Sequence, residues 1–158
     1  MSDTELSIAR ELNLLLQARQ VTVAVAEGSS GGRIGERLAR YTGATAFFKG
    51  SVVTYDYPSR TSLLGLPHDE LREHGSVSEW AVRKMAEGVR NRFGADIGLA
   101  SSGTTGPTGR NVGHLWLAVA SQGGTLTQGH QLASASRLAL QGEFTRLALR
   151  LLRQFLTG

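Results

Sequence analysis

The sequence predicts a single α/β domain over residues 1–158, a sandwich of helices around a mixed sheet. Short apolar stretches with strand character alternate with segments whose apolar residues recur at helical spacing. Towards the C-terminus, two strand-like segments follow each other across Gly123-Gly124, which predicts an antiparallel hairpin. Strands that alternate with helices, followed by an antiparallel pair, together predict the mixed sheet.

The N-terminal half is expected to begin with a helix that Ser2 or Asp3 caps. Pro58 is expected to start a short helix, because proline fits the first helical position. The other expected elements of this half are a strand over 21–26, a helix over 31–40, a β-rich run over 51–55, the proline-started helix over 58–64 and a helical turn over 69–74.

The C-terminal half contains a helix over 79–93 with clear signals at both ends. Ser78 is a good N-cap, and Gly94 is a good residue to end the helix. Val82 and Met85 begin an apolar stripe at helical spacing, which we interpret as core. The other expected elements are strands over 97–100, 115–120 and 125–133 and a last helix over about 135–156.

Two glycine-rich turns that follow strands are the best candidates for a site. The first reads Gly28-Ser29-Ser30-Gly31-Gly32, and the second spans Ser101–Gly109. Because open α/β sheets bind ligands beyond the carboxyl ends of strands, the two turns are expected to line one cleft. The free N–H groups at the start of the next helix suit an anion or a developing oxyanion. A tight turn without any ligand is the alternative for the first turn.

The first turn does not match the common glycine motifs. Its spacing differs from the G-x-G-x-x-G of dinucleotide-binding folds, and no Gly-Lys-Ser/Thr of a P-loop occurs in the chain. Ser29 follows a strand much as the nucleophile of a hydrolase elbow does, but no convincing histidine and acid follow it. The residues alone therefore predict a binding turn and leave its chemistry open.

Composition and charge exclude several classes of protein. The chain has no cysteine, which excludes disulfides, thiol catalysis and cysteine-rich zinc sites. None of the four histidines pairs with another at metal-ligand spacing, so no metal site is predicted. The net charge is +4, yet the 15 arginines are spread along helices, so we expect an anionic small ligand and no nucleic acid. The apolar runs are too short to span a membrane, and we expect a cytoplasmic protein.

An ordered series of short motifs runs along nearly the whole chain. They are Ala26-Glu27-x-Ser29-Ser30-Gly31-Gly32, Phe48-x-Gly50-x-Val52-Val53-x-Tyr55, Leu64-Gly65-Leu66-Pro67, His74-Gly75-Ser76-Val77-Ser78-Glu79, Met85-Ala86-Glu87-Gly88, Gly94-Ala95-Asp96-Ile97-Gly98-Leu99-Ala100 and Gly103-x-x-Gly106-Pro107. In this order they resemble the CinA C-terminal domain family, whose active members are nicotinamide-nucleotide amidases. The resemblance implies a three-layer α/β/α sandwich, a homodimer and a cleft for nicotinamide mononucleotide. It also implies a reaction that releases ammonia and leaves nicotinic acid mononucleotide, without a metal or other cofactor.

The sequence departs from the family pattern where the chemistry is expected. Gly28 stands in place of the serine that the family uses as nucleophile, and Ser30 stands in place of the family's threonine. Arg60 replaces a lysine that can act as base, and arginine stays protonated at physiological pH. His114 stands in place of another threonine, and Arg137 aligns with the family's arginine. Because a nucleophile and its base act as a unit, their loss is expected to remove most amidase activity.

We therefore expect an altered family member that binds a nucleotide-like anion. Its expected binding residues are Glu27, Gly28, Gly31, Gly32, Gly103, Thr105, Gly106, His114 and Arg137, together with the hydroxyl of Ser30 and the cation of Arg60. The first alternative is a working amidase with Ser29 or Ser30 as nucleophile, in which Tyr55 assists proton transfer and Arg60 holds phosphate or the transition state. The second alternative is an interaction protein associated with competence or DNA damage, without enzymatic activity.

Overall fold

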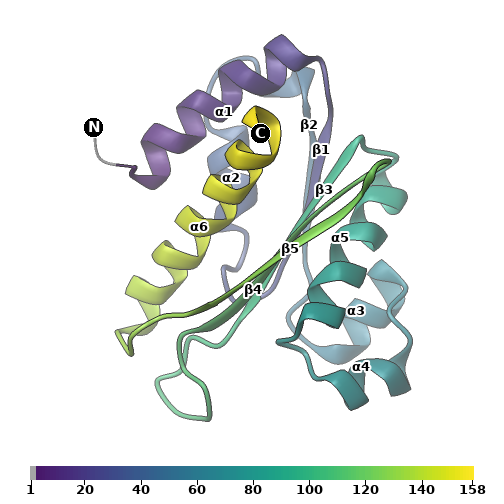
Figure 1. The fold of residues 1–158 in the computed structure, drawn as a ribbon, viewed down its shortest axis with the longest axis vertical. Coiled ribbons are helices and arrows are strands. Elements are labelled where there is room, and N and C mark those ends of the chain that lie inside the picture. The colour runs from purple at the N-terminus through teal and green to yellow at the C-terminus, as the bar shows by residue number, and fades with distance from the viewer. Residues whose placement is uncertain (1–2) are drawn as a thin grey trace.

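The computed structural model describes residues 3–158, which form a five-stranded sheet between two layers of helices (Figure 1). In sheet order, the strands are β2 (Phe48–Val53), β1 (Val23–Glu27), β3 (Ile97–Gly103), β4 (His114–Ser121) and β5 (Gly124–Gln131). Strand β1 pairs in parallel with both β2 and β3, whereas β4 pairs antiparallel with β3 and β5. The predicted mixed sheet is confirmed.

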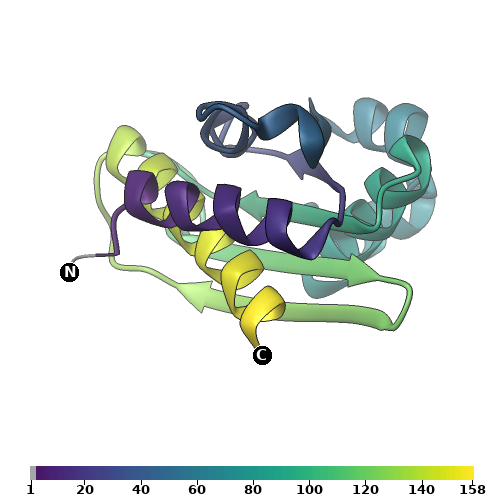
Figure 2. The ribbon, with the colours of Figure 1, turned by 90° about the horizontal axis from the view of Figure 1, so that it is seen from above.

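Helices cover both faces of the sheet (Figures 1 and 2). One face packs against α1 (Glu5–Arg19), α2 (Arg33–Ala39) and α6 (Arg137–Thr157), and the other against α3 (Tyr57–Leu64), α4 (His68–His74) and α5 (Glu79–Phe93). Each face has its own buried apolar cluster, so the fully buried strand β1 lies between two cores. The three-layer α/β/α sandwich is confirmed. No helix within residues 3–158 is long and apolar enough to cross a membrane.

The ends of α5 follow the capping signals in the sequence. The Ser78 hydroxyl accepts a hydrogen bond from the Ala81 N–H at 3.1 Å. Gly94 ends the helix in the left-handed conformation, in which its N–H donates to carbonyl oxygens of the last turn. The predicted bounds of this helix, 79–93, are confirmed.

The first helix is capped at a different residue than predicted. Its N-cap is Thr4 instead of Asp3, because the side chains of Thr4 and Ser7 form a reciprocal capping box. The Thr4 hydroxyl accepts from the Ser7 N–H at 3.1 Å, and the Ser7 hydroxyl accepts from the Thr4 N–H at 3.0 Å. The other predicted cap, Ser2, lies outside the described residues.

Turn geometry and strand pairing shift several predicted bounds. Helix α2 begins at residue 33 instead of 31, because Gly31 and Gly32 have φ values of 65° and 104°, outside the helical region. Strand β3 ends at Gly103 instead of residue 100, because its last residues pair with β4. Strand β2 covers 48–53 instead of 51–55, because its pairing with β1 begins at Phe48.

Gly98 allows α5 to lie close against β3. A Cβ at this position would lie 2.8 Å from the Cβ of Arg90 and well inside contact distance of the Ala86 carbonyl oxygen. We expect Gly98→Ala to lower the free energy of unfolding by about 1–3 kcal/mol, because overpacking displaces neighbouring groups. Urea unfolding measures this loss. The control Gly123→Ala, in the exposed hairpin turn, is expected to stay within about 0.5 kcal/mol of the wild type. An equal loss in both variants would contradict the packing argument.

Candidate functional site

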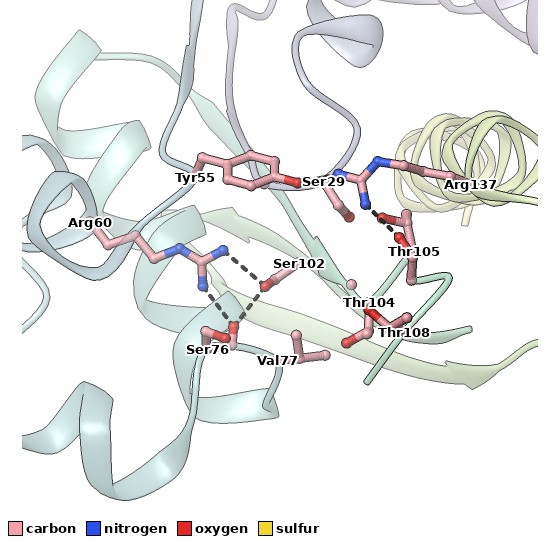
Figure 3. A pocket seen from close by; sticks show the side chains of 13 residues that line it. Ser29, Tyr55, Arg60, Ser76, Val77, Ser102, Thr104, Thr105, Thr108 and Arg137 are labelled. Atoms are coloured by element: carbon pink, nitrogen blue, oxygen red, sulfur yellow. Dashed lines mark hydrogen bonds between the residues drawn. The ribbon is translucent and has the colours of Figure 1, made fainter. Parts of the chain in front are cut away.

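An open cleft of about 380 Å³ lies at the carboxyl ends of β1 and β3 (Figure 3). The connection from β1 to β2 runs through α2 on one face of the sheet, and the connection from β2 to β3 runs through α5 on the other. Such a switch in direction leaves room for a ligand beyond the strand ends. Among the described residues, the lining consists of Gly28, Ser29, Tyr55, Arg60, Ser76, Val77, Ser102, Gly103, Thr104, Thr105, Gly106, Thr108 and Arg137.

A buried carboxylate of the chain itself closes the first glycine turn. Glu27 is 0% exposed, and its Oε1 accepts hydrogen bonds from the Ser30 hydroxyl at 2.6 Å and the Ile34 N–H at 3.0 Å. The carboxylate also accepts from the N–H groups of Gly32 at 3.2 Å and Gly35 at 2.9 Å. The expectation that these N–H groups receive a ligand's anion is therefore wrong, because Glu27 already occupies the start of α2. The predicted site residues that hold this turn without lining the cleft are Glu27, Ser30, Gly31 and Gly32.

Ser29 brings a hydroxyl of the same turn to the cleft (Figure 3). Its Oγ is buried and has no hydrogen-bond partner among the described residues. Its carbonyl oxygen accepts a hydrogen bond from the side-chain amide of Gln141 at 2.9 Å, which ties the turn to α6. Ser29 therefore presents a free hydroxyl without a base in place to activate it.

Arg60 brings a positive charge without a counter-ion to the cleft. The residue is 4% exposed. Its Nε donates to the Thr54 carbonyl at 3.1 Å, its Nη1 to the Ser76 carbonyl at 2.7 Å and its Nη2 to the Ser102 hydroxyl at 3.1 Å (Figure 3). All three acceptors are neutral, and no carboxylate within residues 3–158 pairs with this guanidinium. Burial lowers the pKa of Arg60, but a guanidinium in a protein stays protonated.

Gly28 makes room for the guanidinium of Arg60. A Cβ on Gly28 would lie 2.9 Å from Nη2 of Arg60. The φ of Gly28 lies outside the left-handed region, so its backbone conformation does not require glycine. The side chain of Arg60 is therefore the nearest obstacle to a larger residue at position 28.

Arg137 brings a second positive charge from the opposite side of the cleft (Figure 3). This exposed residue begins α6, and its Nη1 donates to the Gly106 carbonyl at 2.7 Å. Its Nη2 donates to the hydroxyl of Tyr55, which follows β2. These contacts join the start of α6 to the second glycine turn and to the end of β2. Arg137 has no carboxylate partner in the part of the chain that the structure describes.

The cleft has a net positive charge and many hydroxyl groups. No acidic side chain belongs to its lining within the described residues. Hydroxyls and guanidinium groups together suit a phosphate or a carboxylate, because charge-assisted hydrogen bonds to such anions are strong. No group of three or more histidine, aspartate or glutamate side chains in residues 3–158 is placed to hold a metal ion.

Comparison with known proteins identifies the family. A sequence model described as the CinA C-terminal domain matches residues 5–156. The chain belongs to this family. CinA-like proteins from Syntrophus aciditrophicus and Gloeobacter violaceus are 38% identical over 148 residues and 41% identical over 145 residues, which is 91% and 89% of this chain. The same alignments cover 35% and 34% of those relatives, so the chain spans about a third of their length.

A solved structure shows the same fold. The competence damage-inducible protein A from Klebsiella pneumoniae superposes with a TM-score of 0.93 and 28% sequence identity. The superposition covers 98% of this chain and 98% of that protein. The two chains therefore share this fold over almost their whole length.

His114 does not line the cleft of this CinA domain, in contrast to the prediction. Its backbone is fixed in the sheet, where it begins β4 and pairs with Gln131 of β5. Its ring lies 6.3 Å from the ring of Trp116, which shares its face of the strand. Of the predicted residues in the second glycine turn, those that do line the cleft are Gly103, Thr105 and Gly106.

Sequence reasoning missed the three residues that hold Arg60, which are Thr54, Ser76 and Ser102. Ser76 lies in one of the motifs that carry the family resemblance, and Ser102 lies in the second glycine turn. Both segments were therefore identified as notable in the sequence. Their contact with Arg60 was not identified, because spacing along the chain does not show which segments meet.

Proposed function

We propose that this CinA domain binds a nucleotide-like anion, such as a pyridine mononucleotide, and lacks the ordinary amidase activity of the family. The observation that carries the proposal is the buried guanidinium of Arg60, which has only neutral partners. Burial of a charge costs several kcal/mol unless an opposite charge lies nearby. A bound anion supplies that opposite charge at the cleft.

The two sides of the cleft support a ligand with a phosphate group. Arg137 is exposed and lies beside the second glycine turn, whose Thr105 and Thr108 also line the cleft. A phosphate oxygen accepts hydrogen bonds from a guanidinium and from hydroxyls at the same time. A phosphate monoester therefore fits this side better than a neutral group does.

Gly28 and Arg60 support the loss of amidase activity. In the family pattern that the sequence resembles, a serine and a lysine stand at these two positions. Gly28 has no hydroxyl to attack an amide, and a protonated guanidinium cannot accept a proton. Because the two residues are neighbours in space, a single region of the cleft has lost both functions.

A working amidase with Ser29 as nucleophile is the second candidate function. The observation that favours it is the buried Ser29 hydroxyl, which has no partner among the described residues and borders the cleft. Ser30 is a weaker candidate, because its hydroxyl donates to Glu27 at 2.6 Å and is not part of the lining. Ammonia release from nicotinamide mononucleotide that disappears in Ser29→Ala would support this second candidate.

Calorimetric titration with nicotinamide mononucleotide tests the proposed binding. We expect saturable binding that Arg137→Met weakens about ten-fold or more, because the variant loses charge-assisted hydrogen bonds to the ligand. Arg92→Met is the matched control, since it removes the same charge from an exposed position of α5 that does not line the cleft. Its affinity is expected to match that of the wild type. No binding by the wild-type protein would overturn the proposal.

That the chain forms a homodimer and that it is located in the cytoplasm remain predictions and are part of this proposal. The assembly is measured by light scattering on the purified chain. A role associated with competence or DNA damage remains an alternative. The absence of any nucleotide or anion binding would favour that alternative.

A further inference from the structure

We propose that Arg60 makes the cleft select a ligand whose buried end is a carboxylate over the same ligand with a carboxamide. The inference rests on the proposed function, because it concerns the same cleft. It names the ligand class as a phosphate monoester that also has a carboxylate. Three features of the site support it: a free N–H beside an open space, acceptors that are already used, and a second cation on the other side.

The guanidinium of Arg60 retains donors that the protein does not use. Each terminal nitrogen of a guanidinium has two N–H groups. Nη1 and Nη2 each donate one hydrogen bond, to Ser76 and Ser102, so each keeps one N–H without an acceptor among the described residues. Arg60 and Gly28 both line the cleft, and Nη2 is the atom nearest to the position that a Cβ of Gly28 would take. An oxygen atom of a ligand can approach Arg60 there.

The two oxygens that hold the terminal nitrogens of Arg60 already accept hydrogen bonds. The Ser76 carbonyl accepts from Arg60 Nη1 at 2.7 Å and from the Ser102 hydroxyl at 2.6 Å, which uses both of its lone pairs (Figure 3). The Ser102 hydroxyl in turn accepts from Arg60 Nη2 at 3.1 Å. The NH₂ of a carboxamide would therefore find at most one free lone pair on these two oxygens and a cation beside it. A carboxylate needs only donors, and its charge neutralises Arg60.

The second cation fixes which end of the ligand lies where. Arg60 is buried, whereas Arg137 is exposed on the opposite side of the cleft. A phosphate is strongly hydrated and suits the exposed side with its hydroxyls, while a planar carboxylate suits the buried guanidinium. The cleft is therefore complementary to a molecule with an anionic group at each end.

Nicotinic acid mononucleotide and nicotinamide mononucleotide form a matched pair of probes for this inference, because they differ only in carboxylate and carboxamide. In calorimetric titration of the wild-type chain at pH 7, we expect the acid to bind about ten-fold tighter, the difference between a charged and a neutral hydrogen bond. Equal affinities, or tighter binding of the amide, would overturn the inference and leave the proposed function standing. No binding of either probe would overturn both.

Two variants assign the preference to a residue. In Arg60→Met, the ratio of the two affinities is expected to fall to about one, because the selecting cation is gone. In Arg137→Met, both affinities are expected to fall while their ratio stays about ten-fold, because the phosphate side serves both probes. An unchanged ratio in a folded Arg60→Met protein would contradict the assignment to Arg60. If that variant does not fold, the wild-type ratio still decides the inference.

Discussion

Replacing Glu27 by alanine is expected to lower the free energy of unfolding by about 3 kcal/mol or more. The carboxylate is fully buried and accepts four hydrogen bonds, one from the Ser30 hydroxyl and three from the N–H groups of Gly32, Ile34 and Gly35. Alanine leaves these donors unpaired in a water-poor interior and also removes the negative charge from the start of α2. Urea unfolding, followed by far-ultraviolet circular dichroism, measures the loss.

Glu27→Gln is the matched control for this effect. Glutamine has the same shape and keeps one carbonyl oxygen, whose two lone pairs can still pair two of the three donors that contact Oε1. Its NH₂ group faces the Gly35 N–H, which loses its acceptor. We therefore expect an intermediate loss of stability. A stability of Glu27→Ala within about 1 kcal/mol of the wild type would show that water replaces the carboxylate, and would contradict the capping role.

The elements that the sequence predicts most closely are those with signals inside a few residues. Helix α5 begins after Ser78 and ends at Gly94, because both caps act through their nearest neighbours. The mixed sheet is predictable for a similar reason, since alternation of strands and helices and a short hairpin are both local patterns. Strand bounds were less accurate, because pairing with a distant strand decides where β3 ends.

The site shows the limit of local patterns more clearly. A glycine-rich turn before a helix predicted an anion site, but the anion at that helix is Glu27, the last residue of the preceding strand. The sequence signal that could have shown this is the single carboxylate at the end of an otherwise apolar buried strand. Arg60 was named from the sequence, whereas its contacts with Ser76 and Ser102 join helix α3, the segment before α5 and strand β3, which no spacing rule connects.

Exchanging Gly28 for serine and Arg60 for lysine in one protein is expected to raise ammonia release from nicotinamide mononucleotide about a thousand-fold or more over the wild type. A Cβ at position 28 would lie 2.9 Å from Nη2 of Arg60. Lysine is shorter, and its amine falls near the carbon at the centre of the guanidinium, so the exchange clears this space and leaves the amine within reach of the serine hydroxyl. The acceptors that hold Arg60 remain for the lysine.

The same surroundings tune the new lysine for proton transfer. A buried amine without a carboxylate partner has a lowered pKa, so an appreciable fraction is neutral near pH 7 and can accept the serine proton. Arginine in this position cannot do so, which explains why both residues must change together. Ammonia release is measured enzymatically in parallel for the wild type and the double variant, with calorimetry to show that each protein binds the nucleotide.

Two matched variants separate the contributions of the exchanged pair. The variant Gly28→Ala with Arg60→Lys has the lysine as base but no hydroxyl at position 28. The variant Gly28→Ser alone has a hydroxyl there, but its Cβ lies too close to the guanidinium of Arg60. Both are expected to release no ammonia, because nucleophile and base act as a unit. Activity in the alanine variant, or in the wild type, would assign the nucleophile to a residue other than position 28, with Ser29 as the first candidate. A double variant that binds nicotinamide mononucleotide but releases no ammonia would contradict the claim that Gly28 and Arg60 alone account for the lost reaction. Ser30, whose hydroxyl already donates to Glu27, would then be the next residue to test.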